Sequence, residues 1–181
     1  MSNPYTVLGS KRAHQGTFLS VREDEVRLEN GHTFTYEMVE HPGGAAILPI
    51  DSQGICYLVK QYRHPVGRDV LEVPAGRLES AATQAEEDAV RECSEEVGFT
   101  PKTVTSLGRV LPSPGVVQEV IYLFLGEDLE RREQDLDPFE ILDIVKIPFD
   151  DLYQMLIDGL IDDAKTAMCI LRAHHIRTSR S

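Results

Sequence analysis

The sequence has little cysteine and no segment typical of export or membrane insertion. Its three cysteines, Cys56, Cys93 and Cys169, lie far apart and form no CxxC pair, which argues against a zinc site or a disulfide framework. An N-terminal apolar run with a basic flank is absent, and so is any stretch of about eighteen apolar residues. We therefore expect a protein of the reducing cytoplasm that is neither exported nor embedded in a membrane.

Basic residues are also scarce. The chain has 18 Lys and Arg against 30 Asp and Glu, which gives a net charge of -12. This charge opposes the long-range attraction of a polyanion, so we expect no nucleic-acid partner. A small phosphorylated substrate can still bind where divalent cations and a few arginines neutralise it.

Length and composition suit an ordinary buried core. With 181 residues, 41% of them hydrophobic, the chain needs no disulfide to stabilise it, and composition alone favours one domain. The pattern predicts a hairpin within 17–38 that turns at Asn30-Gly31, and a mobile polar loop over 127–138. Further strands are expected at 43–50, 55–62, 69–73, 104–111, 116–125 and 141–147, and helices at 83–97 with Gly98 as C-cap, 148–159 and 162–175. Such a mixture of strands and helices indicates an α+β sandwich.

Three carboxylates share one face of the first predicted helix. Glu92, Glu95 and Glu96 stand at positions i, i+3 and i+4. Neighbouring carboxylates repel one another and raise each other's pKa, so a cation among them would stabilise the arrangement. The alternative is an ordinary solvated acidic helix, which the preceding acidic run at 86–88 favours. The triplet alone does not decide between the two.

The surrounding residues favour the metal site. Leu71-Glu72-Val73-Pro74-Ala75-Gly76 leads into the helix, and the run from Arg91 to Phe99 reads Arg-Glu-Cys-Ser-Glu-Glu-Val-Gly-Phe. This frame resembles the signature of the Nudix hydrolases, and its second half matches throughout. In the first half, fourteen residues (77 to 90) separate Gly76 from Arg91, one more than in the pattern, and Ala82 or Thr83 stands where the pattern has its first Glu. We expect an altered loop with a working metal helix.

Weaker similarities point to the family's ADP-ribose and nucleotide-sugar branch. That resemblance implies a Nudix α/β/α sandwich with a mixed sheet over residues 44–181, preceded by a small antiparallel sheet over residues 1–43. It also implies a homodimer in which the N-terminal sheet crosses to the second subunit and contacts substrate there.

The resemblance also implies a catalytic centre. Glu92 and Glu96 would be the main ligands of Mg²⁺, with Mn²⁺ as a substitute, and Glu95 and the carbonyl of Ala75 would complete the site. Arg91 would orient the carboxylates. Glu140 occupies the place of a Glu that serves the branch as catalytic base or as a further metal ligand. Its alternative is an exposed, solvated loop acid.

Substrate contacts are implied for eight residues. Arg63 would hold the pyrophosphate through its planar fork, although a surface Arg paired with an acid is the alternative. The segment with Ser113 and Gly115 resembles the branch's substrate loop, or else is an ordinary Pro-Gly turn. An aromatic ring at Tyr36 can stack on a purine, or simply lie half-buried in the hairpin. The full set comprises Tyr36, Glu37, His41, Arg63, Arg77, Ser113, Gly115 and Glu119.

The predicted function is the hydrolysis of the pyrophosphate of nucleoside diphosphate sugars. The substrate would be ADP-ribose or a hexose nucleotide such as GDP-mannose, and the products a nucleoside monophosphate and a sugar phosphate. Two alternatives remain: a catalytically silent ADP-ribose sensor, and a hydrolase of dinucleoside polyphosphates.

Overall fold

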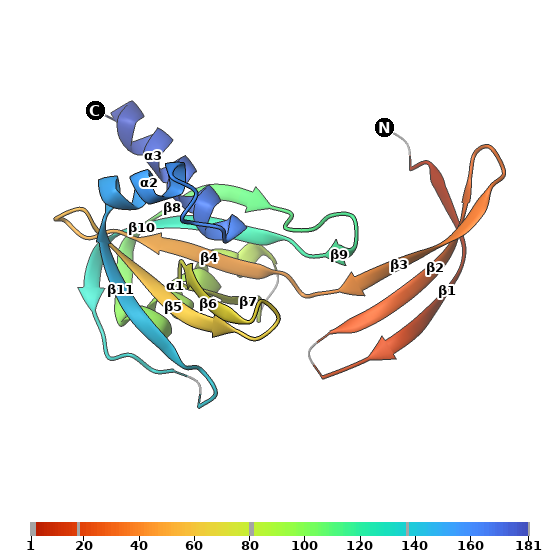
Figure 1. Cartoon of the computed structure of the whole chain (residues 1–181), viewed down its shortest axis with the longest axis horizontal. Coiled ribbons are helices and arrows are strands. Elements are labelled where there is room, and N and C mark those ends of the chain that lie inside the picture. Colours follow the sequence, from red (N-terminus) through yellow and green to blue (C-terminus); the bar gives the residue numbers. More distant parts are fainter. Residues whose placement is uncertain (1–2, 18, 80–81, 137, 181) are drawn as a thin grey trace. The chain divides into compact units, whose positions relative to one another are not determined.

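The computed structural model describes residues 3–17, 19–79, 82–136 and 138–180. Two units divide the chain (Figure 1). The first comprises residues 1–43 together with 111–120, and the second comprises 44–110 together with 121–181.

The first unit is built on one sheet with the strand order β1-β2-β3-β9. Strands β2 and β3 form the predicted hairpin, and Gly31 adopts a φ of 88° at its turn. This conformation favours glycine, so the Asn-Gly signal is confirmed. The N-terminal strand β1 was not predicted; it pairs antiparallel with β2. The bounds are β1 Tyr5–Gln15, β2 Ser20–Leu28, β3 Thr33–Glu40 and β9 Val117–Gln118.

The short strand β9 explains why residues 111–120 belong to the first unit. It pairs parallel with the end of β3, and the amide of Val39 donates to the carbonyl of Val116 at 2.8 Å. The sequence prediction assigned this segment to the second domain. The pairing of distant strands decides its place, and no local pattern reports it.

The second unit contains two sheets, with strand orders β7-β4-β10-β8 and β11-β5-β6. Strands β4 and β10 run parallel and the other pairs are antiparallel, so the unit has the mixed sheet that was predicted. The bounds are β4 Gly44–Pro49, β5 Ile55–Arg63, β6 Arg68–Glu72, β7 Ala75–Arg77, β8 Phe99–Val110, β10 Ile121–Arg131 and β11 Leu142–Pro148.

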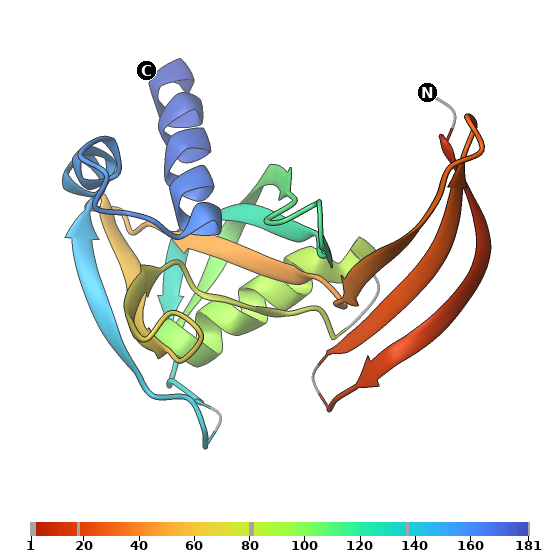
Figure 2. The same cartoon turned by 45° about the vertical axis from the view of Figure 1, so that its right-hand side comes forward.

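Helices cover the strands of the second unit from both sides (Figure 2). Strand β4 shows why, because successive side chains point to opposite faces. Ala45 and Ile47 pack with helix α1, whereas Ala46 and Leu48 pack with α2 and α3. The predicted α+β sandwich is confirmed. The bounds are α1 Ala85–Val97, α2 Phe149–Ile157 and α3 Ala164–Arg180, with a 3₁₀ turn at Ala82–Gln84 before α1.

The first part of the segment expected to be a mobile loop is a paired strand, and residue 137 of that segment lies outside the described residues. Strand β10 continues to Arg131 and stays paired with β8 over Phe99–Thr103, so the loop prediction is wrong for 127–131. Beyond the strand, the side-chain amide of Gln134 donates to the backbone carbonyl of Glu96 at 2.6 Å. The backbone amide of Asp135 donates to the backbone carbonyl of Glu95 at 3.1 Å. These bonds satisfy carbonyls that the end of α1 leaves without helical partners.

Two further observations bear on the predictions from composition. Each of the three cysteines is a buried free thiol. Of the helices that the structure describes, none has the length and apolar character needed to cross a membrane.

Candidate active site

The three carboxylates of α1 lie next to the apolar face of the helix. Ala89 and Cys93 are fully buried against the sheets, and this packing draws the adjacent positions inward. Glu92 and Glu96 are therefore nearly buried, at 8% and 4% exposure, while Glu95 stays partly exposed. Buried carboxylates are costly unless they are paired or bind a cation.

Strand β7, which follows β6, approaches this carboxylate face closely. The backbone amide of Ala75 donates to Oε2 of Glu96 at 3.1 Å. At Gly76, an added Cβ would lie 1.9 Å from Oε1 of Glu92. Residue 76 must therefore be glycine if the Glu92 carboxylate is to occupy this place. The glycine and the glutamate of the sequence frame form one spatial unit.

Arg91 neutralises two of the three carboxylates. Its Nη1 lies 2.5 Å from Glu95 and its Nη2 lies 2.7 Å from Glu92. The Nε atom is buried and has no hydrogen-bond partner among the described residues. Arg91 thus holds two of the charges that were predicted to bind metal.

Within the described part of the chain, Glu96 forms no ion pair comparable to those of Glu92 and Glu95 with Arg91. Burial raises its pKa to about 8, the nearby charges of Glu92 and Glu140 add to this, and the Ala75 amide and Arg63 oppose it. The pKa of Glu92 is also raised by burial, against the opposing charge of Arg91. The two carboxylates consequently repel one another in a poorly solvated place.

The residue types on this face fit a divalent cation. Carboxylate and carbonyl oxygens are the ligands that Mg²⁺ takes, and a cation would relieve the repulsion between Glu92 and Glu96. Among the residues that the structure describes, however, no group of three His, Cys, Asp or Glu side chains is gathered closely enough to hold a metal. Arg91 holds Glu92 and Glu95 at its own guanidinium instead.

A separate ion network lies at the ends of β5 and β6. Arg63 donates from Nε and Nη2 to the two carboxylate oxygens of Glu72, at 2.6 and 2.8 Å. Lys165, at the start of α3, also donates to Glu72. Arg63 thus has the acidic partner that the alternative interpretation expected, and its contact with the pyrophosphate stays a prediction. These residues and Arg68 line a cavity of about 430 Å³.

Sequence reasoning assigned no role to Glu72 or Lys165. Glu72 belongs to the frame before Gly76, but its buried position at 2% exposure follows from packing that the local pattern does not show. Lys165 lies 93 residues away in the sequence. The signal available in the sequence was the charged Glu72 between the apolar residues Leu71 and Val73.

Glu140 and Arg77 are the remaining predicted residues of the second unit. Glu140 is half-buried between β10 and β11, and its charge acts on both Glu92 and Glu96. Its neighbours Phe139 and Ile141 are 94% and 85% exposed. Arg77 is exposed at the end of β7. The structure therefore brings Glu140 within electrostatic reach of the carboxylate face.

The other predicted substrate residues belong to the first unit. The hydroxyl of Tyr36 donates to the carbonyl of Gly115 at 3.2 Å, and both residues line a cavity of about 330 Å³. Nδ1 of His41 lies 3.3 Å from Oε1 of Glu119 and accepts from the amide of Gly43 at 3.1 Å. The remaining two predicted residues, Glu37 and Ser113, are exposed.

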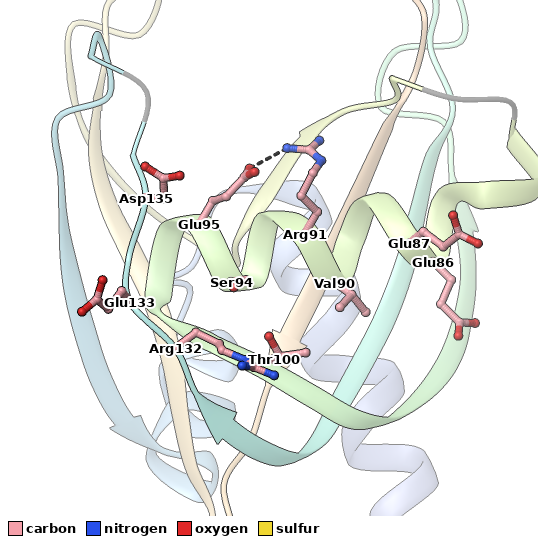
Figure 3. Close-up of a pocket in the computed structure, with 10 residues that line it drawn as sticks. All are labelled: Glu86, Glu87, Val90, Arg91, Ser94, Glu95, Thr100, Arg132, Glu133 and Asp135. Atoms are coloured by element: carbon pink, nitrogen blue, oxygen red, sulfur yellow. Dashed lines mark hydrogen bonds and ion pairs between the residues drawn. The ribbon is translucent and has the colours of Figure 1, made fainter.

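A wider cavity of about 690 Å³ lies on the outer side of α1 (Figure 3). Arg91 and Glu95 reach toward each other at one edge of the helix, and Arg132 comes from the segment that follows β10. Glu92 and Glu96 do not line it. The buried carboxylates face Ala75 and Gly76 of β7, so this cavity is not the predicted metal centre.

Comparison with known proteins decides the family. The model of the NUDIX domain matches residues 40–168, which include the whole of α1 with its carboxylates and strand β7 with Gly76. The chain belongs to the Nudix family. The family resemblance seen in the sequence is thereby confirmed. Residues 5–46 of this Nudix protein also match the model of the nucleoside diphosphate sugar hydrolase N-terminal domain.

Individual relatives agree with this assignment. The Nudix chain is 33% identical over 165 residues to an ADP-ribose pyrophosphatase of Bacillus subtilis (strain 168), covering 90% of this chain and 89% of that protein. It is 32% identical over 144 residues to a GDP-mannose pyrophosphatase of Yersinia pestis (strain Pestoides F), covering 74% and 72%. A crystal structure titled ADP compounds hydrolase superposes with a TM-score of 0.87 at 20% identity, covering 99% and 97% of the two chains, and shows the shared fold.

Proposed function

We propose that this Nudix protein hydrolyses the pyrophosphate bond of nucleoside diphosphate sugars, releasing a nucleoside monophosphate and a sugar phosphate. The observation that carries the proposal is the buried pair Glu92 and Glu96, packed against a glycine that leaves room for a carboxylate. Relatives named ADP-ribose pyrophosphatase and GDP-mannose pyrophosphatase support ADP-ribose or a hexose nucleotide as the substrate.

The residues of the second unit supply complementary chemistry. Arg63 would bind a phosphate of the substrate, because its charge is permanent and its N–H groups match phosphate oxygens. Glu140 would position the attacking water and accept its proton as the oxygen bonds to phosphorus and the bridging P–O bond breaks. Arg91 would hold Glu92 and Glu95 in place.

Divalent metal is the proposed cofactor. Held by Glu92, Glu95, Glu96 and the carbonyl of Ala75, Mg²⁺ would screen the pyrophosphate charge and acidify a bound water, and Mn²⁺ could substitute for it. The alternative role of Glu140 is that of a further ligand. The elevated pKa of Glu96 supports this assignment, because that carboxylate has the most to gain from a cation.

The first unit would supply recognition of the base and ribose. Tyr36 offers an aromatic face beside the Gly115 loop, where a purine can stack. Glu37, His41, Ser113 and Glu119 add hydrogen-bonding groups on the same unit. These polar groups would decide between ADP-ribose and a hexose nucleotide, since a hydrogen bond left unmade in a pocket costs affinity.

A homodimer completes the proposal. The first unit exposes the large apolar side chains of Tyr5, Val7, Leu8 and Phe34 along β1 and β3. Apolar side chains that lie together at a surface commonly mark an interface, and a second copy of this chain would cover them. The three buried free thiols agree with a reducing cytoplasm.

The direct test is a substrate panel. The purified protein is incubated with Mg²⁺ and ADP-ribose, GDP-mannose, ADP-glucose, UDP-glucose, diadenosine polyphosphates or nucleoside triphosphates, and the products are separated by chromatography. We expect a nucleoside monophosphate from the nucleotide sugars, abolished by EDTA. Preferred cleavage of diadenosine polyphosphates would replace the proposed substrate class. Measurable binding of ADP-ribose without turnover would indicate a sensor.

A further inference from the structure

A buried carboxylate, that of Glu72, holds one edge of the Arg63 guanidinium. Glu72 is 2% exposed and accepts from Nε and Nη2 of Arg63 through both of its oxygens. This two-point contact fixes the plane of the guanidinium as well as its position. The two N–H groups of Nη1 take no part in it, and the Arg63 side chain remains 40% exposed. One edge of the fork is thus held by Glu72, and Nη1 is the group that would donate to a phosphate.

A third residue holds the carboxylate itself. Lys165 donates to Glu72 and lies 3.0 Å from Asp163. Although burial opposes the negative charge of Glu72, its pKa is lowered because Arg63 and Lys165 stabilise that charge. Glu72 therefore stays ionised in a nearly water-free place, and its geometry depends on both cations.

The start of α3 is also tied to the strand that carries Glu72. The hydroxyl of Thr166, fully buried, accepts from the amide of Val73 at 2.8 Å and donates to Asp163 at 2.6 Å. The chain continues from Val73 to the amide of Ala75, which donates to Glu96. The helix thus supports the ion network and the loop at the carboxylate face together.

Arg63 also interacts with the carboxylate face electrostatically. Its charge lowers the pKa of Glu96, and Glu96 in turn contributes to raising the pKa of Arg63. The substrate's phosphates are expected at this carboxylate face. A small rotation of the guanidinium would change its distance from them. Misplacement by about 1 Å can cost roughly a hundredfold in rate.

We propose that Glu72 and Lys165 are positioning residues that hold Arg63 in the orientation in which it binds the pyrophosphate. This inference rests on the proposed function, because it assigns Arg63 to the substrate. The competing explanation is that the network only stabilises the fold, as many buried ion pairs do.

A double-mutant cycle between Arg63 and Glu72 separates the two explanations. Glu72→Gln keeps the shape of the side chain, and in the double variant with Arg63→Ala, Lys165 still pairs with Asp163. We expect Glu72→Gln to lower kcat/KM for the nucleotide sugar at least about tenfold. In the Arg63→Ala background it should change kcat/KM less than about twofold, because the group it orients is gone. If the loss of kcat/KM in the double variant equalled the product of the losses in the two single variants, the proposal would be overturned.

Lys165 provides an independent check with a matched control. Lys165→Met should raise KM and lower kcat/KM, and Lys165→Arg should restore most of the loss by returning the cation. Lys60→Met makes the same change at a half-exposed lysine on β5, paired with Asp69 at 3.1 Å, and should leave the kinetics unchanged. Equal kinetics of Lys165→Met and wild type, at equal melting temperature, would refute the role of Lys165. Absence of turnover in the wild type would instead refute the proposed function.

Discussion

Gly76 leaves open the space that the carboxylate of Glu92 occupies: a Cβ on residue 76 would lie 1.9 Å from Oε1 and 2.7 Å from Oε2 of that side chain. The two residues come from β7 and α1, which pack against each other. Gly76 is not among the glycines with positive φ, so its backbone conformation does not require glycine. The requirement comes from the space that a Cβ would take.

Gly76→Ala should therefore displace Glu92 and lower metal-dependent turnover at least about tenfold, because a charge-stabilising group loses its place. Steady-state kinetics over a range of Mg²⁺ concentrations would measure the loss. Gly9→Ala is the matched control, since a Cβ at Gly9 would meet no atom of the described residues within 4 Å. Wild-type kinetics in Gly76→Ala would show that Glu92 can move without consequence.

Glu96→Gln should leave the fold intact and lower turnover at least about a hundredfold, as expected for the loss of one charge-stabilising group. The amide oxygen of the new side chain can still accept from the Ala75 backbone, which argues for an unchanged melting temperature without metal near pH 5, where Glu96 of the folded wild type is still protonated. Kinetics and thermal melting together provide the test. Wild-type-like turnover with normal melting would remove Glu96 from the site.

The stability of the metal-free protein should fall as pH rises from about 5 to about 8. Glu96 keeps its proton up to a pKa of about 8 in the folded state but loses it near 4.5 when unfolded, so the folded state binds more protons throughout this window. We expect the melting temperature to drop by at least about 3 °C, at roughly 2–4 °C per kcal/mol for a chain of this size.

Two controls accompany the pH measurement. Glu96→Gln should flatten the dependence, because the titrating group is gone. Mg²⁺ should restore stability at pH 8, because it binds the ionised carboxylates of the folded state only. A melting temperature that stays constant or rises across the window in EDTA would contradict the assignment.

Glu140→Gln should lower kcat at least about a hundredfold, the usual scale for loss of a general base, with little change in melting temperature. The residue is only half-buried, so its neutralisation should not disturb packing. Glu133→Gln is the control: Glu133 is exposed on the preceding segment and lines the outer cavity. If Glu140→Gln shifted only the Mg²⁺ dependence and kept kcat at saturating metal, Glu140 would act as a ligand rather than a base.

The features that the sequence predicted well are those with a local physical cause. The 3.6-residue period of a helix places Glu92, Glu95 and Glu96 on one side whatever surrounds them. The Asn-Gly pair at 30 and 31 determines a tight hairpin turn, and Gly98 ends α1 with a φ of 72°, as a left-handed cap requires. Hydrophobic alternation likewise located most strands to within a few residues.

The failures share the opposite property. The strand over 127–131 was missed because its polar side chains resemble those of a loop, while its backbone is held by the distant strand β8. Residues 111–120 joined the N-terminal unit through the pairing of β9 with β3. Neither pairing leaves a mark in the local pattern.

The sequence by itself determined the identity of the charged groups, their spacing on α1 and the family frame around them, because helix geometry and turn preferences act over a few residues. The tertiary structure alone decided which charges are neutralised. Arg91 pairs with Glu92 and Glu95, Glu72 is enclosed by Arg63 and Lys165, and Glu96 is left buried with a raised pKa. Burial and the meeting of residues up to 93 positions apart set these relationships, and both depend on how the whole chain packs.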